Sequence, residues 1–381
     1  MQIAFYAPMK HPDSPVPSGD REMARNLIRA LSRRHRVEVA SRFCSRDGAG
    51  NPDRQRRIAY LGAGLSARLV RRWLVAASRP DAWLTYHVYH KAPDVIGPAV
   101  SLALGIPYFM AEVSHAPKRA DGAWDTGYRA AEAAIRVADG IIGLSSLDAA
   151  CVLPLLADPA RYHRLAPFTD TAPYAAAAQR RAVHRQNLCA RFGIAPDTPL
   201  LLAVGMMRDG DKLASYRVLA DALGRISERR WNVIIVGDGP ARSATERGFA
   251  ELASERVHFA GSAEPDALPG FYAAADLMVW PAINEAYGMA MLEAQCTGLP
   301  VVAGHTGGVP DVVRDGETGI LAPVGDASGF ASAVAELLDC PDRLQKMRQR
   351  ALLETAAHND IDAAASRLDE ILKTAPRVCA E

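Results

Sequence analysis

Two glutamates, Glu285 and Glu293, stand eight residues apart in the stretch NEAYGMAMLEAQCTGLP. An apolar run precedes this stretch and Gly-Leu-Pro closes it, a pattern that predicts a loop followed by a helix from about Tyr287 to Thr297. Glu285 would then lie in the loop and Glu293 about two turns inside the helix. Carboxylates at these places could hold two sugars, a ribose and a hexose. The spacing also fits a plain alternative, in which Glu285 caps the helix and Glu293 is solvated.

The start of the same helix is a candidate anion site. Its first backbone N–H groups, expected at Ala286, Tyr287, Gly288 and Met289, have no partner inside the helix. Together with the helix dipole they favour an anion such as a pyrophosphate. We therefore expect these four residues to contribute to nucleotide binding.

A second set of candidate ligands lies in the stretch AVGMMRDGDKLASY. Arg208 and Lys212 lie four residues apart in a loop that follows an apolar run, and two cations there suit an anionic ligand. A charged surface loop is the alternative. The D-x-D spacing of Asp209, Gly210 and Asp211 is one that binds divalent metal in many sugar transferases. Because Lys212 adjoins it and Asp-Gly-Asp is ordinary turn chemistry, we expect no metal there.

Two glycine patterns have different interpretations. Gly237 and Gly239 in VGDGP follow a strand-like run and would let a nucleotide approach the backbone closely. Gly62, Gly64 and Ala67 match G-x-G-x-x-A, but the apolar run before them is short and the nearest acidic residue comes too early for a ribose carboxylate. A dinucleotide site is therefore not expected there.

Length and charge limit the class of protein. A chain of 381 residues predicts two domains. Hydrophobic residues make up 49% and charged residues 23%, which is typical of a soluble globular protein. Residues 1–90 contain 16 Lys and Arg against 7 Asp and Glu, a net +9, so the remaining residues sum to −8. The basic part favours an anionic partner or membrane surface, or it reflects solvated helix faces.

The cellular context follows from what the chain contains. Its six cysteines form no C-x-x-C pair, which fits a reduced compartment with neither a disulfide framework nor a cysteine zinc site. The start MQIAFYAPMK is typical of a strand, and no run of 18 apolar residues occurs. We expect a cytoplasmic protein. Peripheral contact with the inner membrane face is an option through the amphipathic stretch around Arg68, Arg71 and Arg72, which could instead cover a sheet.

Short apolar runs alternate with helical patterns along the chain, which predicts parallel sheets with helices on both faces. The pattern is interrupted between residues 154 and 199, where we place a domain boundary near 167–170. Strands are expected at 3–7, 36–41, 82–86, 108–113, 140–145, 200–205, 231–240, 257–261, 276–281 and 300–304.

The chain resembles the family-4 glycosyltransferases, which have the GT-B fold, over nearly its whole length. The strongest match is to the family's E-x7-E signature, at Glu285 to Glu293. The match continues at Ala294, Gly298, Pro300, Val301, Val302, Gly307, Gly308, Asp311 and Gly319, and in LAPVGD, VGDGP and AAEAAIRVADGIIGLSS.

The resemblance implies two Rossmann-like domains that face a cleft, with the nucleotide sugar held mainly by the second. The first would be residues 1–170 on the acceptor side and the second residues 185–355. A final helix, residues 356–381, would pack back on the first domain.

Roles for individual residues also come from the resemblance. Glu293 should bind the ribose hydroxyls and Glu285 the donor sugar. Arg208 and Lys212 should hold the diphosphate, although Met206 occupies the place where the family often has its arginine. Gly19, in the first loop, should approach the phosphates or the acceptor.

The acceptor side is less defined. The family commonly places a histidine shortly after the strand that begins at Gly-Ile-Pro. In this chain Val113 lies near that point and His115 follows two residues later. Glu112 and His115 are both candidates to serve the acceptor, and the sequence does not choose between them.

The implied activity is transfer of a hexose, with retention of anomeric configuration, from a UDP- or GDP-linked sugar to a hydroxyl acceptor. No cofactor and no metal are implied. The acceptor would be lipid-linked, a saccharide or a small molecule, in polysaccharide or glycoconjugate synthesis. Two alternatives stay open: a sugar-nucleotide epimerase of the same fold, and a sugar-nucleotide-binding protein without transfer activity. No basic stripe with interleaved aromatic residues favours nucleic acid.

Overall fold

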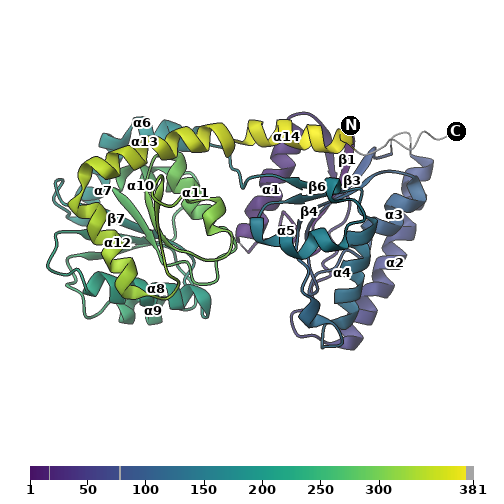
Figure 1. Ribbon diagram of the computed structural model, residues 1–381, viewed down its shortest axis with the longest axis horizontal. Coiled ribbons are helices and arrows are strands. Elements are labelled where there is room, and N and C mark those ends of the chain that lie inside the picture. The colour runs from purple at the N-terminus through teal and green to yellow at the C-terminus, as the bar shows by residue number, and fades with distance from the viewer. Residues whose placement is uncertain (17, 77–78, 375–381) are drawn as a thin grey trace. The chain divides into compact units, whose positions relative to one another are not determined.

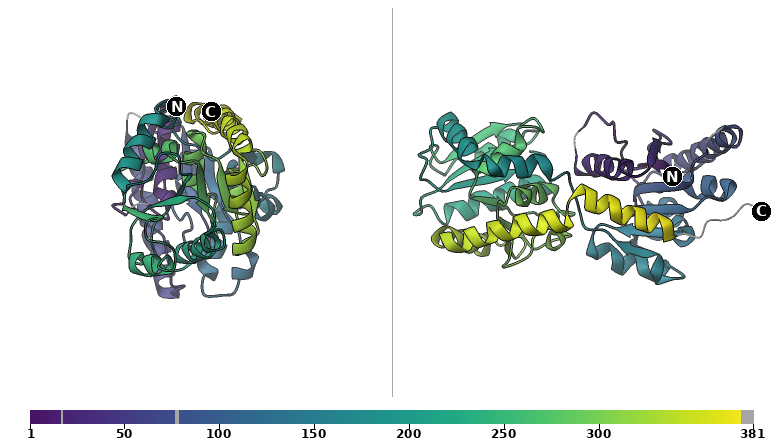
Figure 2. Two further views of the ribbon diagram at one scale, coloured as in Figure 1. Left: turned by 90° about the vertical axis from the view of Figure 1, so that its left-hand side faces the viewer. Right: turned by 90° about the horizontal axis from the view of Figure 1, so that it is seen from above.

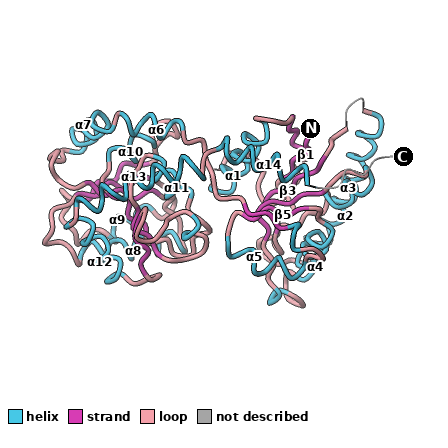
Figure 3. Tube along the Cα trace, turned by 45° about the horizontal axis from the view of Figure 1, so that its top comes forward, coloured by secondary structure: helices cyan, strands magenta, loops and turns pink. Residues whose placement is uncertain are grey.

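The computed structural model describes residues 1–16, 18–76 and 79–374, and it divides the chain into two compact units (Figure 1). The N-terminal unit comprises Met1–Ala166 and Ile361–Glu381, and the C-terminal unit comprises Pro167–Asp360. Each unit is built on a parallel sheet with helices packed around it (Figure 3). The predicted two-domain α/β fold is therefore confirmed.

The sheet of the N-terminal unit has the strand order β2-β1-β3-β4-β5-β6, and every pairing is parallel. Its helices lie on both faces (Figure 2). The strands are β1 (Gln2–Tyr6), β2 (Arg36–Val39), β3 (Ala82–Val88), β4 (Tyr108–Val113), β5 (Gly140–Gly143) and β6 (Tyr162–Arg164). The helices are α1 (Gly19–Ser32), α2 (Pro52–Val75), α3 (Gly97–Leu104), α4 (Asp125–Val137), α5 (Ser146–Val152) and α14 (Ile361–Thr374), with short 3-10 turns at Pro117–Arg119, Leu153–Leu155 and Pro159–Arg161.

Helix α2 covers its own sheet. Leu69 and Trp73 are buried in the core of the N-terminal unit, where the Trp73 ring lies edge-on to Trp83 at 6.2 Å between centroids. Gly62, from the G-x-G-x-x-A pattern, lies inside this helix, where an added Cβ would come within 2.5 Å of Val95. The pattern is thus helical and not a strand-to-helix turn, which agrees with the expectation of no dinucleotide site.

The sheet of the C-terminal unit has the order β12-β11-β10-β7-β8-β9, again with parallel pairings throughout. Its strands are β7 (Leu200–Val204), β8 (Asn232–Val236), β9 (Val257–Gly261), β10 (Leu277–Trp280), β11 (Val301–Gly304) and β12 (Gly319–Ala322). Its helices are α6 (Ala172–Gln179), α7 (Arg181–Phe192), α8 (Asp211–Gly224), α9 (Arg242–Gly248), α10 (Leu268–Ala274), α11 (Met289–Cys296), α12 (Ala327–Asp339) and α13 (Pro341–His358), with a 3-10 turn at Val309–Asp311.

The strand orders place two positions where ligands commonly bind. In the N-terminal sheet the order reverses between β1 and β3, and in the C-terminal sheet it reverses between β7 and β10. At such a reversal the loops that follow the two neighbouring strands run to opposite faces of the sheet and leave a crevice at the carboxyl edge. Residues directly after β1, β3, β7 and β10 are therefore the first candidates for a site.

The end of the chain differs from the single helix expected over 356–381. Helix α13 ends at His358, and α14 begins at Ile361 after a break at Asn359. The Asn359 amide donates to the Pro167 carbonyl oxygen at 2.6 Å, and the Asn359 carbonyl accepts from the Thr169 amide at 3.0 Å. These bonds hold residue 359 out of the helical path. Residues 375–381 of the expected helix lie outside the described residues.

Helix α14 packs on α1 within the N-terminal unit. Arg33 and Asp362 form an ion pair at 3.1 Å, and the Arg34 guanidinium donates to the Ser366 hydroxyl at 2.8 Å. The apolar side of α14, which includes Leu368, Ile371 and Leu372, is buried. The C-terminal segment therefore completes the N-terminal unit, although it follows the whole C-terminal unit in the sequence.

Five of the six cysteines fall in the described residues, and these five are free thiols; Cys379 lies outside the described residues. Among the described helices, none is long and apolar enough to cross a membrane.

Asp276, just before β10, joins helix α7 to the C-terminal sheet. Its carboxylate accepts from Arg181 at 2.6 Å, from Arg185 at 2.9 Å and from the Leu200 amide at 2.8 Å. Burial, together with the charge of Arg181, lowers the pKa of the nearby Arg348 guanidinium to about 10. One carboxylate thus serves several crowded guanidinium groups.

We expect Asp276→Asn to destabilise the C-terminal unit by about 2–3 kcal/mol, because it removes a charge-assisted acceptor and leaves the arginines unbalanced. Urea unfolding followed by circular dichroism measures the change. The matched control is Asp197→Asn, which breaks an exposed pair with Arg230 and should cost about 0.5 kcal/mol or less. Equal effects of the two substitutions would contradict the assigned role of Asp276.

Candidate functional site

Lys212 and Glu285 meet at the carboxyl edge of the C-terminal sheet. Lys212 lies in the first turn of α8, which follows β7, and Glu285 lies in the loop after β10. The Lys212 ammonium forms an ion pair with Glu285 Oε2, and both side chains are about four-fifths buried. The two residues are 73 positions apart in the sequence. The reversal of strand order between β7 and β10 is what brings them together.

Trp280, the last residue of β10, supports this pair. Its indole N–H donates to the same Glu285 oxygen at 3.2 Å, and the Lys212 ammonium lies 5.1 Å from the centre of its ring. Tyr216, one helical turn after Lys212, packs edge-on against Trp280 at 5.0 Å and donates its hydroxyl to the Gly205 carbonyl at 2.7 Å. Burial raises the pKa of Tyr216, which keeps it a neutral donor. Trp280 therefore contacts both members of the ion pair, and Tyr216 packs against Trp280.

The loop that carries Glu285 has an unusual backbone. Ala282 and Asn284 are in the left-handed region, with φ of 55° and 51°. The Ser215 hydroxyl accepts from the Ile283 amide at 3.0 Å, and the Asn284 side chain donates to Asp211 at 2.9 Å. Left-handed residues other than glycine persist where surrounding contacts over-determine them, often at functional sites. Here these contacts tie the loop to α8.

A neighbouring loop packs tightly against the same segment. Gly307 has φ of 54°, and an added Cβ would lie 1.9 Å from the Glu285 carbonyl oxygen. The Gly308 amide donates to the Ala286 carbonyl at 2.5 Å. Gly307 and Gly308, which belong to the resemblance noted in the sequence, therefore fix the path of the loop that positions Glu285.

Gly237 and Gly239 have a structural role that the sequence analysis did not predict. Their φ values are 146° and 151°, and an added Cβ would lie 1.9 Å from the Gly205 carbonyl oxygen and 2.3 Å from that of Met207, respectively. The loop after β8 thus packs directly on the loop after β7. Contact of these two glycines with a nucleotide stays a prediction.

Helix α11 begins later than predicted. It runs from Met289 to Cys296, and Gly288 precedes it in the left-handed conformation with φ of 74°. Ala286, Tyr287 and Gly288 therefore lie in the loop before the helix, and the first-turn amides belong to Met289 and Ala290. Tyr287 is buried and Ala286 is exposed. The start of the helix moved because Gly288 adopts a conformation that ordinary helical residues avoid.

Glu293 is the fifth residue of α11, so it lies little more than one turn inside the helix, not two. Its Oε2 accepts from the Tyr272 hydroxyl at 2.9 Å. Burial and the charge of Glu293 raise the pKa of Tyr272 well above its ordinary value, so this hydroxyl remains a donor. Glu293 thus has a hydrogen-bond partner different from those of Glu285, and the separate roles expected for the two carboxylates stay predictions.

The remaining candidates around β7 are exposed. Arg208 is exposed, as are Asp209 and Asp211 of the D-x-D pattern. Asp211 accepts from the Asn284 side chain and lies in the first turn of α8, where a carboxylate is stabilised by the helix dipole. These contacts account for Asp211 as part of the loop anchor.

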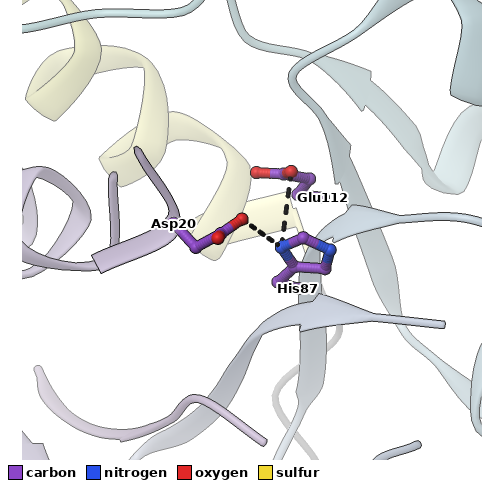
Figure 4. Close-up of side chains that lie close together, drawn as sticks. All are labelled: Asp20, His87 and Glu112. Carbon is purple, nitrogen blue, oxygen red and sulfur yellow. Dashed lines mark ion pairs between the residues drawn. The ribbon is translucent and has the colours of Figure 1, made fainter. Parts of the chain in front are cut away.

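A second cluster, which the sequence analysis did not identify as a set, lies in the N-terminal unit. His87 Nδ1 is 3.2 Å from Asp20 Oδ1 and 3.5 Å from Glu112 Oε1 (Figure 4). Asp20 follows β1 in the first turn of α1, His87 is near the end of β3 and Glu112 is near the end of β4. The cluster therefore lies at the reversal of strand order in the N-terminal sheet.

The backbone at this cluster is strained in two neighbouring strands. His87 and Glu112 have φ of 62° and 54°, at a cost of roughly 1–2 kcal/mol each. They lie at the same level of the β3–β4 ladder, between the register pairs Tyr86–Ala111 and Val88–Val113. Burial alone would lower the pKa of His87, but the charge of Glu112 and the contact with Asp20 outweigh burial and raise it to about 9.

His115 and Gly19 have other surroundings. His115 Nε2 is 3.4 Å from Glu132 Oε2, and its ring lies on Tyr128 at 5.0 Å, so the side chain packs on α4. An added Cβ on Gly19 would meet only open space, so no neighbouring atom requires a glycine there. Both candidates for the acceptor side are buried, but Glu112 lies at the carboxyl edge near the switch point, whereas His115 packs on α4.

Comparison with known proteins finds a family match within the C-terminal unit. Residues 198–340 match the family described as glycosyl transferases group 1. A D-inositol 3-phosphate glycosyltransferase of Nocardia farcinica is 38% identical over 177 residues, which are 44% of this chain and 39% of the relative. A protein of the same name from Corynebacterium efficiens is 33% identical over 226 residues, 58% of this chain and 52% of the relative. The chain thus matches about half or less of the length of these relatives.

Solved structures share the whole fold. Anabaena HepE in complex with UDP and glucose superposes with a TM-score of 0.71 at 19% identity, covering 98% of this chain and 99% of HepE. A glycosyltransferase from Rickettsia africae gives a TM-score of 0.75 at 15% identity, covering 98% of both chains. The chain therefore has the GT-B fold of these proteins.

Proposed function

We propose that the protein is a retaining glycosyltransferase that moves a hexose from a nucleotide diphosphate sugar to an acceptor hydroxyl. The observation that carries the proposal is the pairing of Lys212 with Glu285 at the carboxyl edge of the C-terminal sheet, beside the first turns of α8 and α11. A cation and two helix starts suit a diphosphate, and a carboxylate beside them suits sugar hydroxyls. The match of residues 198–340 to glycosyl transferases group 1 covers the same residues.

The proposed donor geometry assigns the ligands to two positions. The diphosphate takes the Lys212 ammonium and the amides of Met289 and Ala290, and Glu285 remains held by Trp280 and accepts from the hexose hydroxyls. Glu293 accepts from the ribose hydroxyls. In the structure its Oε2 already accepts from another hydroxyl, that of Tyr272. Arg208, exposed on the loop before α8, joins the diphosphate when the donor binds. UDP-glucose is the first donor to test, because HepE was solved with it.

The proposed reaction is a front-face displacement. The acceptor oxygen forms a bond to the anomeric carbon on the side from which the diphosphate leaves. The bond from that carbon to the phosphate oxygen breaks, its electron pair stays on the diphosphate, and the leaving phosphate oxygen takes the acceptor proton. Lys212 and the helix amides stabilise the charge that develops on the diphosphate. The donor side needs no metal and no cofactor in this proposal.

One incubation tests the class of activity. The protein is mixed with UDP-glucose and other UDP-, GDP- and ADP-sugars without acceptor, and the products are separated by chromatography. We expect slow release of the nucleoside diphosphate from one donor, and faster release when inositol 3-phosphate or a neutral saccharide is added. An altered sugar on an intact nucleotide would show an epimerase instead, and tight binding without any product would show a binding protein.

We also propose peripheral contact of the N-terminal unit with anionic lipid on the cytoplasmic side. The net +9 of residues 1–90 supports it, as do the exposed side chains of Tyr60, Leu74 and Val75 on α2, which are 79%, 62% and 87% exposed. We expect the protein to sediment with phosphatidylserine vesicles at low salt and to be released by about 0.5 M salt, because screening shortens the range of the attraction. Sedimentation with neutral vesicles to the same extent would contradict an electrostatic contact.

A further inference from the structure

The geometry of Asp20, His87 and Glu112 points to a divalent metal site of the zinc class in the N-terminal unit. The proposal concerns residues of the N-terminal unit and none of the donor residues around Lys212, and it stands whether or not the protein transfers sugars. Among the described residues, this is the one group of three or more metal-ligating side chains whose ligand atoms come together, and these atoms lie within 4.8 Å of one another.

The distances fit a metal better than a shared proton. Two ligand atoms bound to one tetrahedral Zn²⁺ at its usual bond lengths are about 3.3 Å apart. The two carboxylate oxygens lie 3.2 and 3.5 Å from His87 Nδ1, on either side of that value. The two carboxylates converge on the same ring nitrogen (Figure 4). That nitrogen is buried and forms no hydrogen bond of good geometry with any described residue. A single N–H on this nitrogen would be shared between the two oxygens at poor angles, whereas a metal ion bonds to all three atoms.

The ligand types select the metal. One imidazole with two carboxylates suits Zn²⁺ or Mn²⁺, whereas Mg²⁺ and Ca²⁺ prefer oxygen ligands alone. With the imidazole neutral the three side chains carry two negative charges, which a divalent ion balances. Three protein ligands leave a coordination position open, as in zinc sites that bind an exchangeable oxygen.

The backbone presents the ligands in a fixed arrangement. His87 and Glu112 are both left-handed at the same level of two paired strands, and Asp20 comes from the first turn of a helix whose N-cap, Ser18, accepts from the Arg21 amide. Three separate segments therefore converge, and each holds its ligand on regular structure instead of on a flexible loop. Such preorganised placement favours a site of defined geometry.

The test measures metal binding by the whole protein. Chelator-treated protein is titrated with Zn²⁺ by calorimetry, and Co²⁺ is used to read the ligand type from its absorption spectrum. We expect one equivalent of Zn²⁺ to bind, and a Co²⁺ spectrum without a thiolate band. Asp20→Asn and Glu112→Gln should each weaken Zn²⁺ binding at least about tenfold, and His87→Asn should weaken it more. Asparagine is chosen at position 87 because it tolerates the left-handed backbone.

A matched control comes from another histidine–carboxylate pair of the N-terminal unit, His115 with Glu132, which is not part of a cluster of three metal-ligating side chains among the described residues. His115→Gln should leave Zn²⁺ affinity unchanged. No bound equivalent in the unsubstituted protein, or equal loss on His115→Gln, or a thiolate band that places the metal on a cysteine, would each overturn the site. A failure of sugar transfer would not affect this result, because the readout is metal binding alone.

Discussion

Replacing Lys212 with alanine should lower kcat by about 10²–10³-fold or more while the fold survives. Lys212 is the cation at the proposed diphosphate site, and loss of one preorganised group that stabilises developing charge typically has an effect of this size. The cost in stability should be about 1–3 kcal/mol, because Glu285 is about four-fifths buried and loses its ion-pair partner, while Trp280 still donates to that carboxylate. Initial rates with the donor found in the screen, together with thermal unfolding, measure both effects.

Two further variants separate a direct role of Lys212 from an indirect one. If Lys212 acted only by holding Glu285, then Glu285→Gln alone would reproduce the loss, and the double variant would be no worse. We expect instead that Lys212→Ala loses more in kcat and that Glu285→Gln acts partly through donor affinity. Arg225→Ala, which breaks an exposed pair with Asp221 on the same helix, is the control and should retain full activity. Unchanged turnover of Lys212→Ala would refute the assigned role.

The sequence analysis named Lys212 and Glu285 as separate candidates because both follow apolar runs that alternate with helices, and the resemblance gave both a role in donor binding. In a parallel sheet the residues after such runs share one edge, which is where the structure brings the two together. The sequence analysis did not predict that the two would pair with each other. Trp280 was missed because it is the last residue of a buried apolar strand, where a tryptophan is expected to belong to the hydrophobic core. Its role depends on the indole N–H pointing out of the strand end, which no pattern records.

Two edge strands, β6 and β12, were not predicted. β6 has three residues, Tyr-His-Arg, without an apolar run, and β12 has four residues, Gly-Ile-Leu-Ala, a short apolar run that the sequence analysis did not assign to a strand. Both lie at the edge of a sheet, where a strand is covered less completely and its sequence is less constrained. The ten strands expected from apolar runs are all present, with ends that differ by a few residues.

The cluster of Asp20, His87 and Glu112 could have been proposed from the sequence, but the sequence analysis did not group these three residues. Glu112 was a candidate for the acceptor side, and Asp20 adjoins the predicted Gly19, but His87 was taken as a residue beyond the end of a strand. Each of the three comes near the carboxyl end of β1, β3 or β4, so the same edge argument would have grouped them. The paired left-handed residues His87 and Glu112 lay beyond prediction, because neither residue type demands that backbone.

The other large effect is expected from Gly307→Ala in the loop that contacts the Glu285 segment. A methyl group there would lie 1.9 Å from the Glu285 carbonyl oxygen, and the backbone is left-handed with φ of 54°. The left-handed conformation alone costs roughly 1–2 kcal/mol for alanine, and the clash must also move one of the two loops. We expect a total loss of about 3 kcal/mol or more in the C-terminal unit. Because the Glu285 loop moves, kcat should also fall by roughly 10²-fold.

Gly316→Ala separates the cost of a left-handed alanine from the cost of the clash with the Glu285 segment. Gly316 has φ of 75°, and an added Cβ there would have no atom within 4 Å. It should therefore cost only the conformational part, roughly 1–2 kcal/mol, and leave turnover unchanged. Urea unfolding and hydrogen exchange in the segment 282–296 measure the difference between the two variants. If both lose the same stability and Gly307→Ala keeps full activity, the contact between the two loops does not position Glu285, and the proposed donor geometry loses its support on that side.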